Sequence, residues 1–246
     1  DAMESRGLGD VYKRQVQTFS RLKKENRAGL VTFTMAGDPD AETSLEILNN
    51  LPKAGADIIE LGMPFSDPMA DGKTIQEAGQ RALAQGTTLS GVLAMASAFR
   101  TEHPQVPLIL MGYYNPIYRY GGARFAQDAA TAGVDGVILV DLPPEEEEEF
   151  RSEADKHGLH IIRLLAPTSH DARLPLLLKQ ASGFAYYVAV AGITGTQSAD
   201  YDALGTRIAH LRAFTDIPLA VGFGIKTPEQ VRQVAAYADA VVVGSA

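Results

Sequence analysis

The sequence predicts an α/β fold, a closed (β/α)8 barrel, from three observations. Short, continuous apolar runs recur along the chain, as is typical of parallel strands buried on both faces. Amphipathic helical periodicity fills the intervals between these runs. No linker rich in Pro, Gly and Ser divides the 246 residues, a length close to the roughly 250 residues of a typical barrel. An open doubly wound sheet is the alternative, but its usual G-x-G-x-x-G turn does not follow the first expected strand.

A repeated pattern marks the start of three expected strands. Ala54-Gly55-Ala56-Asp57, Ala132-Gly133-Val134-Asp135 and Ala236-Tyr237-Ala238-Asp239 each precede an apolar run and indicate a helix end, a turn and a strand. The expected strands are 30–35, 58–62, 107–112, 136–141, 159–165, 184–190, 217–221 and 240–244. The expected helices are 41–51, 74–83, 91–100, 123–132, 145–156, 171–180, 202–213 and 228–236.

The two ends of the chain depart from this alternation. Residues 1–15 show no helical or strand period, so we expect an unstructured or foreign extension there and a single barrel domain over 16–246. The last strand ends at Val243 and the sequence stops at Ala246, so we expect the barrel to lack its final helix.

Composition excludes several classes of function. The chain has 22 basic and 30 acidic residues, and a net charge of −8 makes it a poor general binder of nucleic acid or anionic membranes. It has no cysteine, which excludes disulfides and thiolate chemistry. No apolar run reaches the roughly 18 residues of a membrane span. The amino-terminal residues lack the apolar run of a signal peptide, so we expect a cytoplasmic location.

Two acidic residues near the second strand are candidate catalytic groups. Glu60 interrupts an apolar strand, where a carboxylate is costly unless it is protonated or paired, so burial should raise its pKa toward that of a general acid–base. A structural Glu paired with a cation is the alternative. Asp71 lies 11 residues further on, at the end of a Pro- and Gly-rich loop, and either takes a second catalytic role or caps the helix near Thr74.

Glycines follow the last strands, where a barrel places its active site. The segments 192–195, 222–224 and 244–245 can expose backbone N–H groups to a phosphate dianion, although glycine also serves simple turns. The five histidines form no ligand pair, so we expect no metal site. The lysines avoid strand interiors, which disfavours Schiff-base chemistry.

Several of these segments resemble one enzyme family. The run from Ile59 to Gly72 (IELGMPFSDPMADG) closely resembles the signature of the tryptophan synthase α subunit, and it is highly specific. Segments 36–39, 111–117, 192–195 and 222–225 resemble the same family in its order and spacing, from about Thr18 to Ala246. The resemblance implies a (β/α)8 barrel that cleaves indole-3-glycerol phosphate to indole and glyceraldehyde 3-phosphate without a cofactor of its own.

The resemblance also implies roles for individual residues. Glu60 is expected to be the general acid–base, and Asp71 to hold the indole N–H and to contact Thr194 when their loops close. The expected substrate-binding residues are Phe33, Tyr113, Leu164, Tyr186, Thr194 and Phe223. The expected phosphate-binding residues are Gly195, Gly222, Gly224, Gly244 and Ser245.

A partner is implied as well. Family members pair with a β subunit in an α2β2 complex, pass indole to it, and leave pyridoxal phosphate to that subunit. Pro64, Asp67, Asn115 and Pro116 are expected to face the partner. Two other readings stay open from the residues: a non-catalytic barrel that only binds and activates a β subunit, and another phosphate-handling barrel such as a sugar-phosphate isomerase or epimerase.

Overall fold

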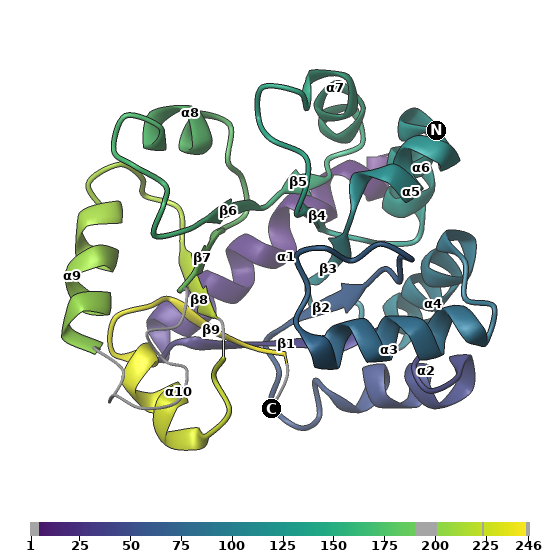
Figure 1. Cartoon of the computed structure of the whole chain (residues 1–246), viewed down its shortest axis with the longest axis horizontal. Coiled ribbons are helices and arrows are strands. Elements are labelled where there is room, and N and C mark those ends of the chain that lie inside the picture. The colour runs from purple at the N-terminus through teal and green to yellow at the C-terminus, as the bar shows by residue number, and fades with distance from the viewer. Residues whose placement is uncertain (1–4, 190–200, 223, 245–246) are drawn as a thin grey trace.

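The chain forms a barrel of parallel strands surrounded by helices (Figure 1). The computed structural model describes residues 5–189, 201–222 and 224–244. Its strands follow the order β5-β4-β3-β2-β1-β9-β8-β7-β6, and all of their pairings are parallel. The strands are β1 (Gly29–Met35), β2 (Ile58–Gly62), β3 (Leu108–Gly112), β4 (Gly136–Leu139), β5 (His160–Ile161), β6 (Arg163–Leu165), β7 (Ala185–Val188), β8 (Leu219–Gly222) and β9 (Ala240–Val243).

The barrel closes at Ile162. β5 pairs with β4 and β6 pairs with β7, and Ile162 is the one residue between β5 and β6. The Ile162 N–H still donates to the Val137 carbonyl oxygen at 2.9 Å, so the chain crosses the break without leaving the sheet. The expected strand 159–165 is therefore two short strands, and the predicted (β/α)8 fold class is confirmed.

Helices cover the outside of the barrel (Figure 1). Eight lie close to their expected ranges, while α5 falls where the sequence predicts a loop. Its Pro116 is the third residue of the helix, a first-turn position at which the missing N–H costs no helical hydrogen bond. The helices after the first are α2 (Ala41–Asn50), α3 (Lys73–Ala84), α4 (Leu89–Glu102), α5 (Tyr114–Tyr120), α6 (Gly122–Thr131), α7 (Glu148–Lys156), α8 (Leu174–Lys179), α9 (Tyr201–Leu211) and α10 (Pro228–Ala235).

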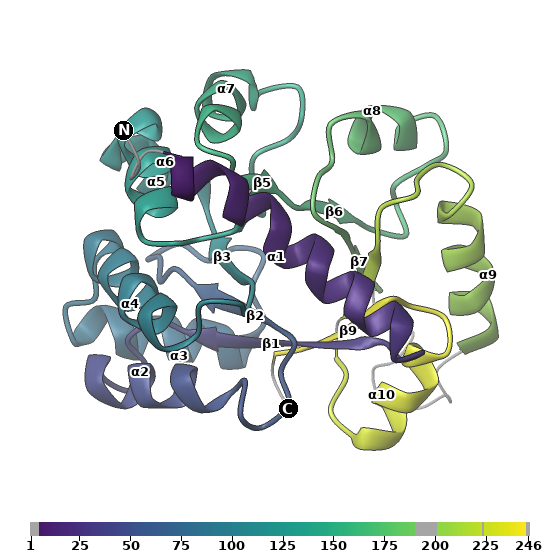
Figure 2. The same cartoon turned by 180° about the vertical axis from the view of Figure 1, so that it is seen from behind.

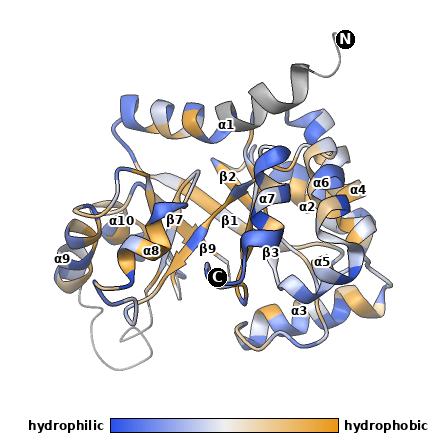
Figure 3. Ribbon diagram, turned by 90° about the horizontal axis from the view of Figure 1, so that it is seen from above, coloured by the Kyte–Doolittle hydropathy of each residue, from blue (hydrophilic) through white to orange (hydrophobic). Residues whose placement is uncertain are grey.

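Helix α1 (Ser5–Lys24) crosses one end of the barrel, as Figure 2 shows from behind. Residues 5–15, part of the predicted unstructured or foreign extension, belong to this helix, and the foreign origin of residues 1–15 stays a prediction. Phe19 lies 5.9 Å from Phe184 between ring centroids and packs against the cluster inside the barrel. Arg14 and Gln15 are buried and bond to Asp135. Figure 3 shows α1 on the opposite side of the barrel from α3.

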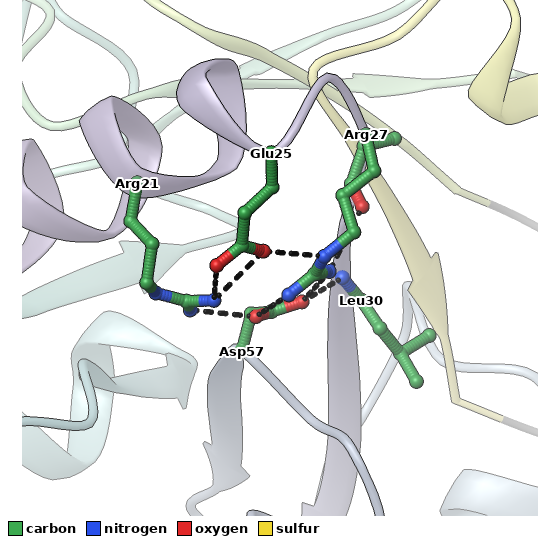
Figure 4. A network of polar contacts seen from close by, with 6 residues as sticks. Arg21, Glu25, Arg27, Leu30 and Asp57 are labelled. Atoms are coloured by element: carbon green, nitrogen blue, oxygen red, sulfur yellow. Dashed lines mark hydrogen bonds and ion pairs between the residues drawn. The ribbon is translucent and has the colours of Figure 1, made fainter.

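The three aspartates of the repeated pattern do the same structural work. Each carboxylate accepts the N–H of the first or second residue of the preceding strand in the barrel: Asp57 from Leu30 at 2.9 Å, Asp135 from Leu108 at 2.8 Å and Asp239 from Leu219 at 2.8 Å. Each also pairs with at least one arginine. Figure 4 shows the Asp57 network with Arg21, Glu25 and Arg27. Each aspartate of the repeat therefore joins the start of its own strand to the start of the neighbouring strand.

Apolar side chains fill the barrel and the layer between its strands and helices. The inner cluster contains Val31, Ile58, Ile109, Ile138 and Phe184, which are fully or almost fully buried. Tyr186 belongs to the same cluster. Figure 3 shows the apolar strands at the centre of the molecule. This packed interior is solid rather than a pore, so the space for a ligand lies beyond the ends of the strands.

No single helix of the described chain is long and apolar enough to cross a membrane. Only α3 and α4 together meet the length and composition of a span, and they are bent by 100° between them.

Candidate active site

A cavity of about 280 Å³ lies at the carboxyl ends of the strands. Five of the residues that line it are predicted site residues: Phe33, Glu60, Tyr186, Gly224 and Gly244. The polar residues Lys73, Thr74 and Lys226, which have no predicted role in the site, also line it. A larger cavity of about 560 Å³ lies beneath α1 at the opposite end, but no predicted site residue lines it, and its Arg212 and Asp239 already pair at 3.0 Å.

Glu60 is buried at the wall of the smaller cavity. All five residues of β2 are buried, and Glu60 is 1% exposed. Its Oε1 atom has no hydrogen-bond partner in the described chain, and no cation among those residues pairs with it. Burial raises the pKa of Glu60 to about 8. The carboxyl group is therefore largely protonated at neutral pH, and the alternative of a Glu held by a structural ion pair does not apply to the described residues.

Tyr186 faces Glu60 from β7. Burial raises the pKa of the Tyr186 hydroxyl, and the nearby Glu60 charge raises it further, so this side chain stays neutral. A Cβ atom added to Gly222 would lie 2.6 Å from the Tyr186 hydroxyl and 2.7 Å from the Val242 Cβ. Gly222 therefore lets the β8 backbone approach Tyr186 closely. Leu164, the register partner of Tyr186 on β6, packs against the same inner cluster.

Asp71 lies half-buried in the loop between β2 and α3. Burial raises its pKa, and a hydrogen bond with Tyr113 opposes that rise. It does not line the cavity, but the four residues that follow it do. The N-cap of α3 is Gly72, without a side-chain capping bond. The interpretation of Asp71 as the cap of this helix is therefore wrong, and its carboxylate does not bond to the first turn of α3.

Tyr113 contacts the loop that carries Asp71. Its hydroxyl accepts the Ala70 N–H at 2.9 Å, and the Tyr113 and Phe65 rings lie 5.3 Å apart between centroids. Burial raises the pKa of Tyr113 to about 12, so the hydroxyl keeps its proton and can donate to Asp71. This side chain is buried, and in this arrangement it contacts the loop rather than the lining of the cavity.

The predicted phosphate-binding residues are only partly described. Gly224 has a φ of +71°, which favours glycine, and nothing lies within 4 Å of the position its Cβ would take. Gly244 lies against Phe33, and both line the cavity. Gly222 is buried in β8. Four predicted residues lie outside the described part of the chain: Thr194, Gly195, Phe223 and Ser245.

The residues expected to face a partner lie on two neighbouring segments. Asp67 is exposed in the β2–α3 loop, Asn115 is exposed on α5, and Pro64 and Pro116 are half-buried. The bond between Tyr113 and Ala70 joins these segments. Each segment also carries one of the most exposed large apolar side chains of the described chain, Met69 at 81% and Tyr118 at 65%.

No group of three or more His, Asp or Glu side chains in the described ranges is arranged to hold a metal ion. The polar groups that surround the cavity are instead one carboxyl, hydroxyls, ammonium groups and backbone amides. The fold and this cavity together define a (β/α)8-barrel enzyme equipped for proton transfer by side chains.

Comparisons with known proteins give the family. The family model for the tryptophan synthase alpha chain matches residues 19–246, and the chain belongs to this family. The structure of tryptophan synthase subunit alpha from Legionella pneumophila str. Paris is 44% identical, with a TM-score of 0.88 over 94% of this chain and 86% of that one. A structure from Aquifex aeolicus VF5 is 40% identical, with a TM-score of 0.86 over 94% and 88%. Mycobacterium tuberculosis tryptophan synthase is 37% identical, with a TM-score of 0.87 over 94% and 88%.

The close approach of Phe33 to β2 gives a prediction about stability. A Cβ atom added at Gly62 would lie 2.6 Å from the Phe33 Cζ and 3.0 Å from the Met35 Sδ, inside a packed wall. We expect Gly62→Ala to lower the free energy of unfolding by about 1–3 kcal/mol, because overpacking forces both side chains to move. Urea denaturation measures this. Gly91→Ala, on helix α4 with only an ordinary contact at 3.5 Å, is the control and should not be destabilised. Equal midpoints for both variants would contradict the prediction.

Proposed function

We propose that Glu60 and Asp71 carry the reaction of this tryptophan synthase alpha chain, the cleavage of indole-3-glycerol phosphate to indole and glyceraldehyde 3-phosphate. Cleavage of the bond to indole C3 needs a proton on that carbon, so that the ring can accept the bonding electrons, and removal of a proton from the adjacent glycerol hydroxyl. A single group with a pKa near neutrality can serve both transfers. The observation that supports Glu60 is its burial at the cavity wall with a pKa of about 8.

We propose that Asp71 acts as an ionised carboxylate, whereas Glu60 is largely neutral. Its half-buried carboxylate lies on a loop next to the cavity, whereas Glu60 is fully buried and largely neutral. Two carboxyl groups in such different surroundings can divide the roles of acid and anion. Asp71 would accept the indole N–H and stabilise the positive charge that develops there, with Thr194 contacting it when the loops close.

The rest of the proposed site binds the two ends of the substrate. The indole ring would pack among Phe33, Tyr113, Leu164, Tyr186 and Phe223. The phosphate would accept backbone N–H groups near Gly195, Gly222, Gly224 and Gly244 and the Ser245 hydroxyl. In support, Phe33, Tyr186, Gly224 and Gly244 line one cavity with Glu60. No cofactor is proposed for this chain, and a cytoplasmic location stays a prediction.

The proposed partner is a tryptophan synthase β subunit in an α2β2 complex, which would hold pyridoxal phosphate and receive the indole. Pro64, Asp67, Asn115 and Pro116 are proposed to contact it. The exposure of Met69 and Tyr118, which lie on these two segments, supports this surface, because exposed large apolar side chains are typical of interfaces. The surface is formed by the same loop that carries Asp71, so binding of the partner can influence the position of that carboxylate.

Asp71→Asn tests the second carboxylate. We expect it to lower kcat for indole release by at least about a hundredfold, because a neutral amide loses the charge stabilisation of the transition state. Indole is measured with and without an added β subunit. Asp155→Asn, which changes an exposed residue on α7, should keep full activity. Near-full activity of Asp71→Asn would refute its role.

The same assay separates the remaining alternative. A barrel that only activates its partner would stimulate the β subunit and release no indole from indole-3-glycerol phosphate. Indole release by the unmodified chain, alone or in the complex, excludes this reading. An isomerase or epimerase of sugar phosphates would share the phosphate glycines but not the segment from Ile59 to Gly72 that carries both carboxyl groups.

A further inference from the structure

We propose that the Lys226 ammonium group binds the phosphate of the substrate and makes the site selective for a dianionic ligand. Lys226 follows Gly222 and Gly224 and precedes Thr227, the N-cap of helix α10, and it is one of the residues that line the cavity with Glu60. The inference rests on the proposed function, since it assigns a residue to the phosphate end of that substrate.

The backbone N–H groups at the start of α10 are mostly bonded already, which leaves the Lys226 side chain as the group that can bind an anion there. A helix amino terminus can bind an anion through its free N–H groups. Here the Gln230 Oε1 accepts the N–H of Lys226 at 2.8 Å and of Thr227 at 3.2 Å. The Gln230 N–H donates to the Thr227 hydroxyl at 3.2 Å, and Pro228 has no N–H. This capping box occupies the N–H groups of Lys226, Thr227 and Gln230, so these three amides are not free for a phosphate, whereas the Lys226 ammonium group is.

The charges around the cavity favour an anion. Its acidic and basic lining residues are Glu60, Lys73 and Lys226, and the fourth titratable residue, Tyr186, stays neutral. Because the pKa of Glu60 is about 8, the carboxyl contributes little negative charge at pH 7, and the cavity is lined by two positive groups. Such a site attracts an anionic ligand and is weakened by salt.

The two lysines are not equivalent. Lys73 is 90% exposed and lies 3.7 Å from Glu77, one turn further along α3, so its charge is partly satisfied. Lys226 has no carboxylate within ion-pair distance in the part of the chain that the structure describes. Its neighbour Glu229 pairs with Arg232 at 2.8 Å instead. Among the described residues no carboxylate competes with a ligand for Lys226, which makes it the stronger candidate.

Glycerol 3-phosphate is the probe that tests Lys226, because its binding can be measured by calorimetry without turnover. We expect Lys226→Ala to weaken its binding about tenfold, the effect of losing one charge-assisted contact. Lys226→Arg, which keeps the charge, should bind within about threefold of the unmodified protein. Lys73→Ala should weaken binding only about twofold, as expected for a paired, exposed charge. Lys53→Ala, an exposed change near the other end of the barrel, should have no effect.

Kinetics provide a second readout. Lys226→Ala should raise KM for indole-3-glycerol phosphate about tenfold and leave kcat within about twofold, since the contact is made equally to bound substrate and transition state. Raising the salt concentration should weaken binding of glycerol 3-phosphate by the unmodified protein more than by the variant. An unchanged melting temperature shows that the variant is folded.

The outcomes separate this inference from the proposed function. Normal lyase activity with unchanged KM and unchanged glycerol 3-phosphate affinity in Lys226→Ala would overturn the assignment of Lys226 and leave the function intact. Binding of glycerol 3-phosphate that depends on Lys226, in a protein that releases no indole, would support the anion site and overturn the function. Failure of the unmodified protein to bind glycerol 3-phosphate, or equal losses in Lys226→Ala and Lys53→Ala, would also overturn the assignment.

Discussion

Glu60→Gln is expected to abolish indole release and at the same time to stabilise the protein. The carboxyl group has a pKa near 4.5 in an unfolded chain and about 8 in the folded protein. Above pH 4.5 the unfolded state has therefore lost a proton that the folded state keeps, and this difference lowers the stability of the protein progressively up to about pH 8. A neutral amide removes that penalty. We expect a gain on the order of 3 kcal/mol at pH 8 and little gain at pH 4.5.

Two measurements check this expectation. Thermal unfolding at pH 8 should show a higher melting temperature for Glu60→Gln, by on the order of 10 °C, and the difference should fade toward pH 4.5. Indole release should fall by about a thousandfold. For the unmodified protein, kcat/KM should decline above about pH 8 as Glu60 loses the proton that it donates. A variant that is inactive but gains no stability at pH 8 would show that Glu60 is not held neutral by burial.

Asp135→Ala is expected to cost about 3–5 kcal/mol of stability, the range for breaking a buried ion pair. The Asp135 side chain is fully buried and accepts bonds from Arg14 at 2.6 Å, Arg100 at 2.7 Å and the Leu108 N–H at 2.8 Å. Its removal leaves two guanidinium groups without their carboxylate, at 10% and 14% side-chain exposure. Urea denaturation measures the loss.

The repeated aspartates provide a matched series for this prediction. Asp57 is almost as buried as Asp135, but its partners Arg21 and Arg27 are nearly half exposed, so we expect Asp57→Ala to cost about 2 kcal/mol. Asp239 and its partner Arg212 are both more than a third exposed, and Asp239→Ala should cost about 1 kcal/mol. An equal loss at all three positions would show that the bond to the strand N–H matters and that the burial of the arginines does not.

The order of strands and helices could be predicted because its signals are local. Apolar runs and the turns before them identify strands regardless of what they contact, and Glu60 stands out as a charge within such a run. The break at Ile162 could not be predicted, because it depends on two neighbouring strands. Helix α5 was missed because Asn115-Pro116 is typical of a turn, although a proline in the first helical turn is compatible with both structures.

Features that depend on contacts between distant parts of the chain could not be predicted from the sequence. Helix α1 is held by Asp135 and Phe184, which lie far along the chain. Lys73 and Lys226 are two of the eight lysines in the sequence, without a distinguishing pattern around them, and only the fold brings both to the cavity of Glu60. Asp71 could be singled out, but the choice between a helix cap and a functional carboxylate needed the position of Gly72 as the N-cap.

The docking of α1 has a consequence for synthesis of the chain on the ribosome. The helix is made before the residues that it contacts, which are Asp57, Asp135 and Phe184, the last of them more than 160 residues later. Contacts of such long sequence separation slow folding, because a large loop must close before they form. Until Phe184 leaves the ribosome, the apolar face of α1 has no complete site to pack against. Helix α1 is thus made before its docking site and is among the last elements to reach its final position, and chaperone binding to the nascent chain should concentrate there.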